Sequence, residues 1–166
     1  PVPKKVNVGT KSKSSYSSSG SSGGYSFSTN PVYYSTGSVK TRMMWPAPSA
    51  HQITQYFGHN GHKGMDISTS GASGLPVVAA ASGTVVEAAS GWNYGFGNTI
   101  LIDHGNGLQT RYAHLLDYSI RVRVGQQVSQ GQWIAKIGDT GNSFGAHLHF
   151  EVIRNGTRVD PLPYIK

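Results

Sequence analysis

The sequence predicts an all-β fold: a mostly antiparallel sheet domain with a groove over one face, preceded by a flexible basic segment. Three observations predict it. From about residue 43 onward, short runs of alternating or β-branched residues recur, and this is the pattern of half-buried strands. Turn signals rich in glycine and asparagine separate the runs. No stretch of ten residues carries a convincing helical periodicity.

The first element is a leader, residues 1–42. A serine and glycine run at 17–24 and the lack of apolar periodicity predict a flexible linker or tail. Most of the chain's net charge of +7 belongs to the leader, because its charged residues are all basic: Lys4, Lys5, Lys11, Lys13, Lys40 and Arg42. No groove-reading motif accompanies this charge, which serine dilutes, so we do not expect nucleic-acid binding.

The second domain, residues 43–166, is expected to be a series of strands. Their ranges are 65–67, 77–87, 98–104, 108–115, 119–124, 132–137 and 147–154. Hairpin turns are expected at 103–107 and at Asn155-Gly156, which contain residues that favour such turns. His104 falls at the first turn, and His51 and His59 fall in a loop. We expect all three histidines to be solvent-exposed and not to bind a ligand.

Length and composition set further bounds. The 166 residues amount to one domain with additional segments, long enough to bury a core without disulfides, and the chain has no cysteine. No apolar run approaches the length of a membrane span. No secretory signal is visible, but the chain starts at Pro1, so the sequence leaves open a leader or further domains before it.

The segment 146–152 carries the clearest chemical signal. Its strict alternation of polar and apolar residues predicts a strand with His147, His149 and Glu151 on one face and apolar residues on the other. Side chains two residues apart on a strand lie about 7 Å apart. One histidine could therefore bind a metal ion while the other reaches a water molecule on that ion.

Two more histidine motifs accompany it. His62-x-x-x-Asp66 lies in a glycine-crowded segment, which favours a loop entering a short strand over a helix, and His114 ends the alternating run that begins at Leu108. A catalytic zinc usually takes three imidazole or carboxylate ligands and keeps one position for water. His62, Asp66 and His149 would make such a set. Such histidines also occur as surface or hydrogen-bonded core residues, so residue types and spacing alone leave both interpretations open.

Taken in order, the motifs resemble the lysostaphin/LytM-type zinc metallopeptidases, peptidase family M23. The resemblance runs from about Met43 to Lys166. It rests on H-x-x-x-D, then Y-A-H-L about fifty residues later, then H-L-H-F-E. Several further phrases agree with it: Gly74 to Val85, Gly95 to Ile100, Gly138 to Ser143, Arg154-Asn155-Gly156 and Val159-Asp160-Pro161.

The resemblance implies a site and an activity. It implies one zinc ion held by His62, Asp66 and His149, and two catalytic histidines that do not bind the metal, His114 and His147. It implies a secreted, monomeric endopeptidase of the bacterial cell envelope that hydrolyses peptide bonds of peptidoglycan. Which bond is cut, a glycine cross-bridge or a stem peptide or cross-link with D-amino acids, stays open.

Roles within this site are expected as follows. His114 and His147 together would deprotonate the zinc-bound water, stabilise the oxyanion and protonate the departing amine, and the sequence does not divide these tasks between them. Glu151 is expected either to orient one histidine or to be a solvent-exposed strand carboxylate. Substrate contacts are expected from Tyr112, on the same strand face as His114, and from a set of loop residues: Tyr56, Asn93 and Tyr94.

Other interpretations remain. The first is a non-catalytic LytM-type domain that activates another cell-wall hydrolase, against which the intact set of five residues argues. The second is a biotinyl or lipoyl carrier domain, which would need a lysine at a hairpin tip that this chain lacks. The leader is expected to be a solvated linker, or else to bind anionic wall polymers. It also offers Asn7 and Asn30 as residues that could block the zinc, and nothing in the sequence selects either.

Overall fold

The computed structural model describes residues 42–165. The predicted flexible leader, with Asn7 and Asn30, therefore lies outside the described residues, apart from Arg42. Within them the chain forms strands joined by turns and three short 3-10 segments. The strand bounds are β1 Gln52–Gln55, β2 Met65–Ser68, β3 Pro76–Val78, β4 Gly83–Ala89, β5 Asn98–Asp103, β6 Leu108–Leu115, β7 Gln127–Val128, β8 Trp133–Lys136, β9 His147–Arg154 and β10 Thr157–Val159. The 3-10 segments are η1 His59–Gly61, η2 Asn93–Gly95 and η3 Leu162–Tyr164.

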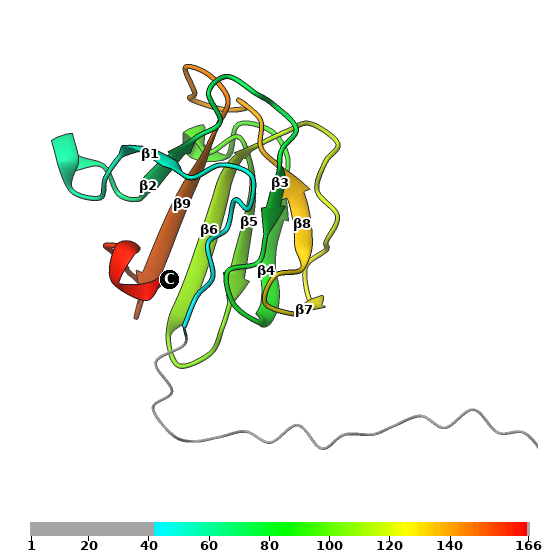
Figure 1. The fold of residues 1–166 in the computed structure, drawn as a ribbon. Coiled ribbons are helices and arrows are strands. Elements are labelled where there is room, and N and C mark those ends of the chain that lie inside the picture. The colour runs from blue at the N-terminus through cyan, green and yellow to red at the C-terminus, as the bar shows by residue number, and fades with distance from the viewer. Residues whose placement is uncertain (1–41, 166) are drawn as a thin grey trace, which may run out of the picture. The chain divides into compact units, whose positions relative to one another are not determined.

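One large sheet organises the molecule. Its strand order is β1-β2-β9-β6-β5-β4-β7, with β10 pairing the end of β9, and the pairs between its strands are antiparallel. A second sheet consists of β3 and β8 (Figure 1). The predicted all-β, mostly antiparallel fold is confirmed.

The strand β9 lies at the centre of the functional half of the sheet. Its apolar residues Leu148, Phe150 and Val152 are fully buried, as the alternation predicts. They pack in a core with residues of the 43–50 segment, β3 and β8. The opposite face of β9 is thereby left to His147, His149 and Glu151, which is the division of faces expected from the sequence.

Two predicted strands differ from the structure. The run 77–87 is not one strand, because buried alanines at 79–81 carry the chain from β3 in the small sheet to β4 in the large one. The run 119–124 is not assigned as a strand. It makes a backbone hydrogen bond from Arg121 N to Ile134 O of 2.9 Å. Alternation of residue types does not show whether a neighbouring strand hydrogen-bonds to the segment along its whole length.

The predicted turns are present. Asn155 and Gly156 join β9 to β10 with φ angles of 49° and 79°, as a type I′ hairpin requires. His104 follows β5 at the other hairpin. It is half-buried and not exposed, because its ring is hydrogen-bonded on both sides, as described below. His51 and His59 are exposed as expected.

Among the described residues, no helix is long and apolar enough to cross a membrane.

Candidate metal centre

Strand pairing brings the predicted metal ligands together. In the antiparallel pair of β2 and β9, Asp66 stands directly opposite His149, so their side chains leave the same face of the sheet. That face is opposite the core, because Met65 and Ile67, the neighbours of Asp66, are fully buried. His62 lies in the loop just before β2. Three residues separate it from Asp66, and this connection is short enough for both side chains to reach one point.

The three ligand atoms form a compact triangle. His62 Nε2 lies 3.1 Å from His149 Nδ1 and 3.2 Å from Asp66 Oδ1, and His149 Nδ1 lies 2.8 Å from Asp66 Oδ1. Ligands at about 2.0–2.1 Å from a tetrahedral zinc lie about 3.3–3.4 Å from one another. The triangle is therefore close to one face of a zinc tetrahedron, and its two nitrogens and one carboxylate oxygen suit that metal.

The far nitrogen of each ligand histidine has its own partner. His62 Nδ1 lies 3.4 Å from the backbone oxygen of Tyr56. His149 Nε2 lies 3.3 Å from Oε1 of Glu151, a carboxylate with no exposed surface. Glu151 is thus not the solvent-exposed strand residue that was one of two expectations. It orients His149, and metal-binding histidines commonly have such a carboxylate partner.

Electrostatics favour an ionised Asp66 beside a basic His149. Burial alone would raise the pKa of Asp66, but its hydrogen bond to His149 and the three nearby histidines lower this pKa overall. Burial alone would lower the pKa of His149. Its hydrogen bonds to Asp66 and Glu151 outweigh burial and raise this pKa to about 8. The proton on His149 thus offsets the negative charge of Asp66. A metal cation bound at the centre of the triangle would offset the same charge.

A β-bulge directs His114 to the same face. Ala113 and His114 of β6 together oppose the single residue Thr99 of β5, and His114 has a φ of 58°. Strict alternation would have placed His114 on the core side with Tyr112, and the extra residue reverses this. The His114 ring lies 4.7 Å from the His147 ring and 5.8 Å from the His149 ring, measured between centroids.

The two histidines that do not belong to the triangle share one arrangement. His114 Nδ1 lies 2.7 Å from Thr140 O, and His147 Nδ1 lies 2.8 Å from Gly145 O. Since a carbonyl only accepts, each Nδ1 carries a proton in this arrangement. Burial lowers the pKa of His114 to about 4 despite the bond to Thr140, so this ring is neutral at pH 7. His147 Nε2 lies 3.8 Å from Asp66 Oδ1.

An open groove of about 730 Å³ lies over these side chains. Its lining includes the five residues His62, Asp66, His114, His147 and His149. The rest of the lining comes from β1, β2 and the turn after it, η2 and the residue after it, and the loop before β9: Thr54, Gln55, Ser68, Gly71, Tyr94, Gly95, Phe96, Asn142, Ser143, Phe144, Gly145 and Ala146.

Of the four expected substrate contacts, Tyr94 lines the groove. Tyr56 is half exposed outside the lining, and its carbonyl faces His62. Asn93 is half-buried and donates from Nδ2 to Gly97 O at 2.9 Å, which stabilises its own loop.

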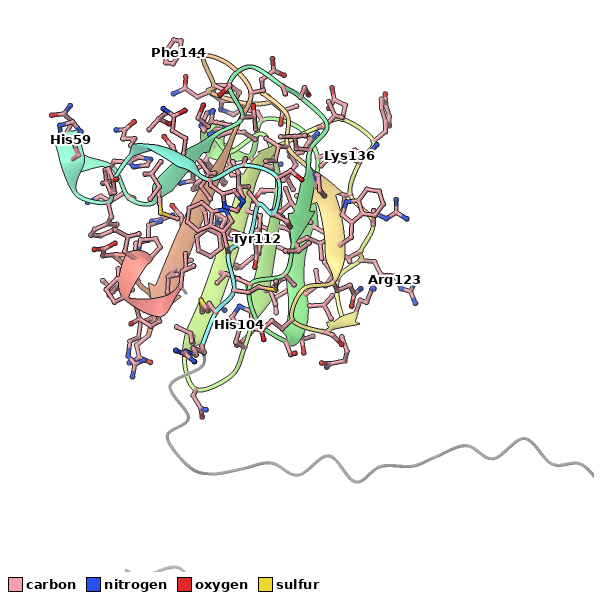
Figure 2. All side chains as sticks on the ribbon, in the orientation of Figure 1. His59, His104, Tyr112, Arg123, Lys136 and Phe144 are labelled. Atoms are coloured by element: carbon pink, nitrogen blue, oxygen red, sulfur yellow. The ribbon has the colours of Figure 1, made fainter. Side chains whose placement is uncertain are left out.

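The expectation for Tyr112 is wrong. Its side chain is fully buried on the core face, 5.4 Å from the Phe150 ring, and its hydroxyl accepts from Ala80 N at 2.8 Å. Figure 2 labels it within the body of the domain. Burial raises its pKa to about 12. The expectation assumed unbroken alternation from Tyr112 to His114, and the bulge between them places the two on opposite faces.

Sequence reasoning missed several residues around the site. Arg158 of β10 donates from Nε to Glu151 Oε1 at 2.7 Å. The Arg111 guanidinium lies 4.7 Å from the centre of the Phe96 ring, and that ring lies 5.9 Å from the His149 ring. Arg111 was not detectable from alternation, since residues three apart on a regular strand lie on opposite faces and only the bulge brings Arg111 and His114 to the same one. Arg158 was not detectable either, because β10 was not predicted.

Comparison with known proteins gives a consistent result. Residues 60–161 match peptidase family M23. The murein hydrolase activator NlpD of Salmonella typhimurium is 37% identical over 139 residues, which is 82% of this chain and 35% of that protein. The chain thus spans about a third of the length of this relative.

Solved structures give the same match. Lysostaphin from Staphylococcus simulans, an antimicrobial peptidase, superposes with a TM-score of 0.65 at 33% identity, over 75% of this chain and 52% of that chain. A zinc-containing peptidase from Vibrio cholerae superposes with a TM-score of 0.62 at 34% identity, over 72% of this chain and 39% of that one.

Proposed function

The chain belongs to peptidase family M23, and from that membership we propose that it is a zinc-dependent endopeptidase that hydrolyses peptide bonds of bacterial peptidoglycan. The observation that carries the proposal is the set of five side chains in one groove. Three of them offer ligand atoms within 3.2 Å of one another. The other two, His114 and His147, each have Nδ1 within 2.8 Å of a backbone carbonyl oxygen. A degenerate site would lack one or more of these groups.

The donor set fits zinc, with His62 Nε2, Asp66 Oδ1 and His149 Nδ1 as its ligands. When bound, zinc supplies Lewis acidity toward a substrate carbonyl and lowers the pKa of a coordinated water to about 7. Glu151 holds His149 with its Nδ1 directed at the other ligands. Asp66 contributes the one negative charge among the three ligands and so offsets part of the metal charge.

His114 and His147 would move the protons. Each is fixed by an Nδ1–H donated to a backbone carbonyl, so each can accept a proton at Nε2 and later donate it from the same atom. Such a ring can take a proton from the attacking water and return one to the departing amine. The neutral state of His114 at pH 7 suits it to accept first. The protonated ring would then stabilise the negative charge on the tetrahedral oxygen.

A second candidate function is activation of another cell-wall hydrolase without catalysis. One observation favours it: the NlpD relative at 37% identity is named for activation of murein hydrolases. The intact set of five residues favours the peptidase. The activator function needs the groove as a binding surface and does not need a proton carrier at position 114, which separates the two candidates experimentally.

Further parts of the proposal follow from the family and the sequence. The chain would act at the bacterial cell envelope or outside the cell, with the peptide part of peptidoglycan as its partner. Residues 43–166 would form the peptidase domain, acting as a monomer, and residues 1–42 a linker with affinity for anionic wall polymers.

The test is digestion of purified peptidoglycan by the full chain with one equivalent of zinc. Walls with glycine cross-bridges and walls with direct D-amino-acid cross-links are compared, and fragments are weighed by mass spectrometry. Cleavage at a peptide bond is expected in at least one. His149→Ala should lose zinc, whereas His114→Ala should keep zinc and lose about 100-fold or more in rate. The activator would be established by two results together. The zinc-loaded chain would cut neither wall, and both the wild type and His114→Ala would stimulate a separate wall hydrolase.

A further inference from the structure

Two aromatic side chains at the edge of the groove contact almost nothing in the protein. Tyr94 of η2 is 99% exposed and Phe144 of the loop before β9 is 102% exposed, and both line the groove. Figure 2 shows Phe144 at the tip of its loop, directed away from the fold. Exposed large aromatics that bury no surface do not stabilise the core, and their position at a pocket indicates binding.

The backbone conformation at Tyr94 is energetically unfavourable. Its φ of 57° follows a φ of 43° at Asn93, and a bulky residue in this left-handed region destabilises the fold. Tyr118 has the same φ and is equally exposed but does not line the groove. Strain and exposure alone therefore assign no role. The position of Tyr94 beside the groove is what distinguishes it.

The two loops that carry the rings are locked together. Asn142 N donates to Gly95 O at 2.8 Å. Side chains at Gly97 and Gly141 would collide with the facing loop's backbone, so the loops are in close backbone contact. The same loop supplies Thr140 O, the acceptor for His114 Nδ1. The rings of Tyr94 and Phe144 are thus carried on a preformed support that is tied to His114.

The groove beside these two rings is neutral outside the candidate metal centre. Its other lining residues are hydroxyl, amide, glycine, alanine and aromatic residues, and the described lining includes no lysine, arginine or glutamate. Nothing there would pair with a charged side chain or a terminal carboxylate of a ligand. The glycines Gly71, Gly95 and Gly145 leave room for close approach of a backbone.

We propose that Tyr94 and Phe144 form an aromatic clamp that binds an extended, uncharged stretch of the substrate peptide with small side chains. The flat peptide groups and the C–H groups of residues such as glycine or alanine would lie against the rings, and the glycines would admit the backbone between them. This inference rests on the proposed function, because it takes the peptide of peptidoglycan as the ligand. It adds the residues that select the segment next to the cleaved bond.

The first test is kinetic, on the full zinc-loaded chain with a soluble cross-linked peptide from peptidoglycan. Phe144→Ala and Tyr94→Gly should each raise KM about five- to tenfold and leave kcat unchanged, because contacts remote from the reacting bond bind substrate and transition state alike. Tyr118→Gly is the matched control and should leave both constants unchanged. Tyr94→Gly should unfold at the same temperature as the wild type or a higher one, so that lost affinity cannot be ascribed to lost folding. Unchanged KM in both groove variants would overturn the clamp.

A second test separates this inference from the proposed function. Binding of the same peptide to zinc-loaded His114→Ala is measured by calorimetry, with and without the two clamp substitutions. If the wild type cleaves nothing, the proposed peptidase function is wrong. Loss of peptide binding when the two rings are removed would still support the clamp. Absence of binding to His114→Ala, or binding that does not depend on the rings, overturns it. The clamp is also overturned if removing the rings weakens binding only of peptides that still carry the sugar, because the rings would then bind glycan and not peptide.

Discussion

At the scale of single residues, Glu151 is the least expected member of the site. It is fully buried, and its Oε1 accepts from Arg158 Nε at 2.7 Å while facing His149 Nε2 at 3.3 Å. Burial alone would raise its pKa, but the hydrogen bonds from His149 and Arg158 lower this pKa overall. A buried carboxylate at neutral pH thus holds His149 in the tautomer and ring orientation that direct Nδ1 toward His62 and Asp66.

We expect Glu151→Gln to weaken zinc binding about 10- to 100-fold, the usual effect of losing the carboxylate behind a metal-binding histidine. A zinc competition titration with a chromogenic chelator measures it. Glu87→Gln is the control, because Glu87 pairs with Arg111 at 2.7 Å without touching a ligand. Equal zinc affinity in the two variants would show that Glu151 has no influence on the metal.

The sequence predicted the ligands but not all of their neighbours. Alternation placed His147, His149 and Glu151 on one face because β9 is regular over its whole length. Tyr112 was misplaced because a bulge of one residue reverses every face that follows it. The clamp residue Phe144 carried no periodic signal, since it lies in a loop whose course is set by contacts with residues far away in the sequence.

At the scale of elements, the β5–β6 hairpin is joined to the segment between β3 and β4 by side chains. His104 Nδ1 lies 2.9 Å from Ser82 O, and its Nε2 lies 2.8 Å from Thr110 Oγ1. The hydroxyls of Thr110 and Tyr112 lie 2.9 Å apart, and Tyr112 accepts from Ala80 N. His104 was expected to be exposed, because a residue at a hairpin turn usually is. Its role depends on the segment between β3 and β4, which the sequence suggested was simply part of one long strand.

This arrangement makes stability depend on pH. Burial lowers the pKa of His104 despite its bond to Ser82, so below the unfolded value of about 6.5 the unfolded chain binds a proton more readily than the folded one. The free energy of unfolding contributed by His104 is complete above that value and declines as the pH falls toward the folded pKa. Urea denaturation measures the free energy of unfolding at pH 7.5 and at pH 5.5. The difference between these two values should be smaller for His104→Gln than for the wild type. His59→Gln, at an exposed position, should keep the wild-type difference, and an equal difference in all three proteins would refute the assignment.

At the scale of the whole molecule, the metal centre connects distant parts of one sheet. His62 lies in the connection after β1, Asp66 on β2 and His149 on β9, and the strand order β1-β2-β9 places β1 at the edge. β1 is a four-residue strand with no fully buried residue, so little burial holds this edge strand to the sheet, whereas Met65 and Ile67 anchor β2 in the core. Spacing along the chain could not show this convergence, because it depends on antiparallel pairing between segments about eighty residues apart. The ordered motifs of the family predicted it.

A cation held by His62, Asp66 and His149 should therefore protect β1 and β2 against local opening as well as stabilise the whole domain against unfolding. Zinc at 100 times its dissociation constant adds about 2.7 kcal/mol to the free energy of unfolding, and a chelator should reverse the gain. Amide hydrogen exchange should slow about 100-fold wherever the opening that exposes an amide releases the ion, which includes opening of β1 and β2 and global unfolding, and should not slow where a local opening leaves the three residues in place. Asp66→Asn should lose both effects, since its side chain lacks the charge that holds the ion. Zinc that left exchange at β1 and β2 unchanged, or slowed it in Asp66→Asn as well, would place the ion elsewhere, because an ion bound by residues of both β2 and β9 must be released when β2 leaves the sheet.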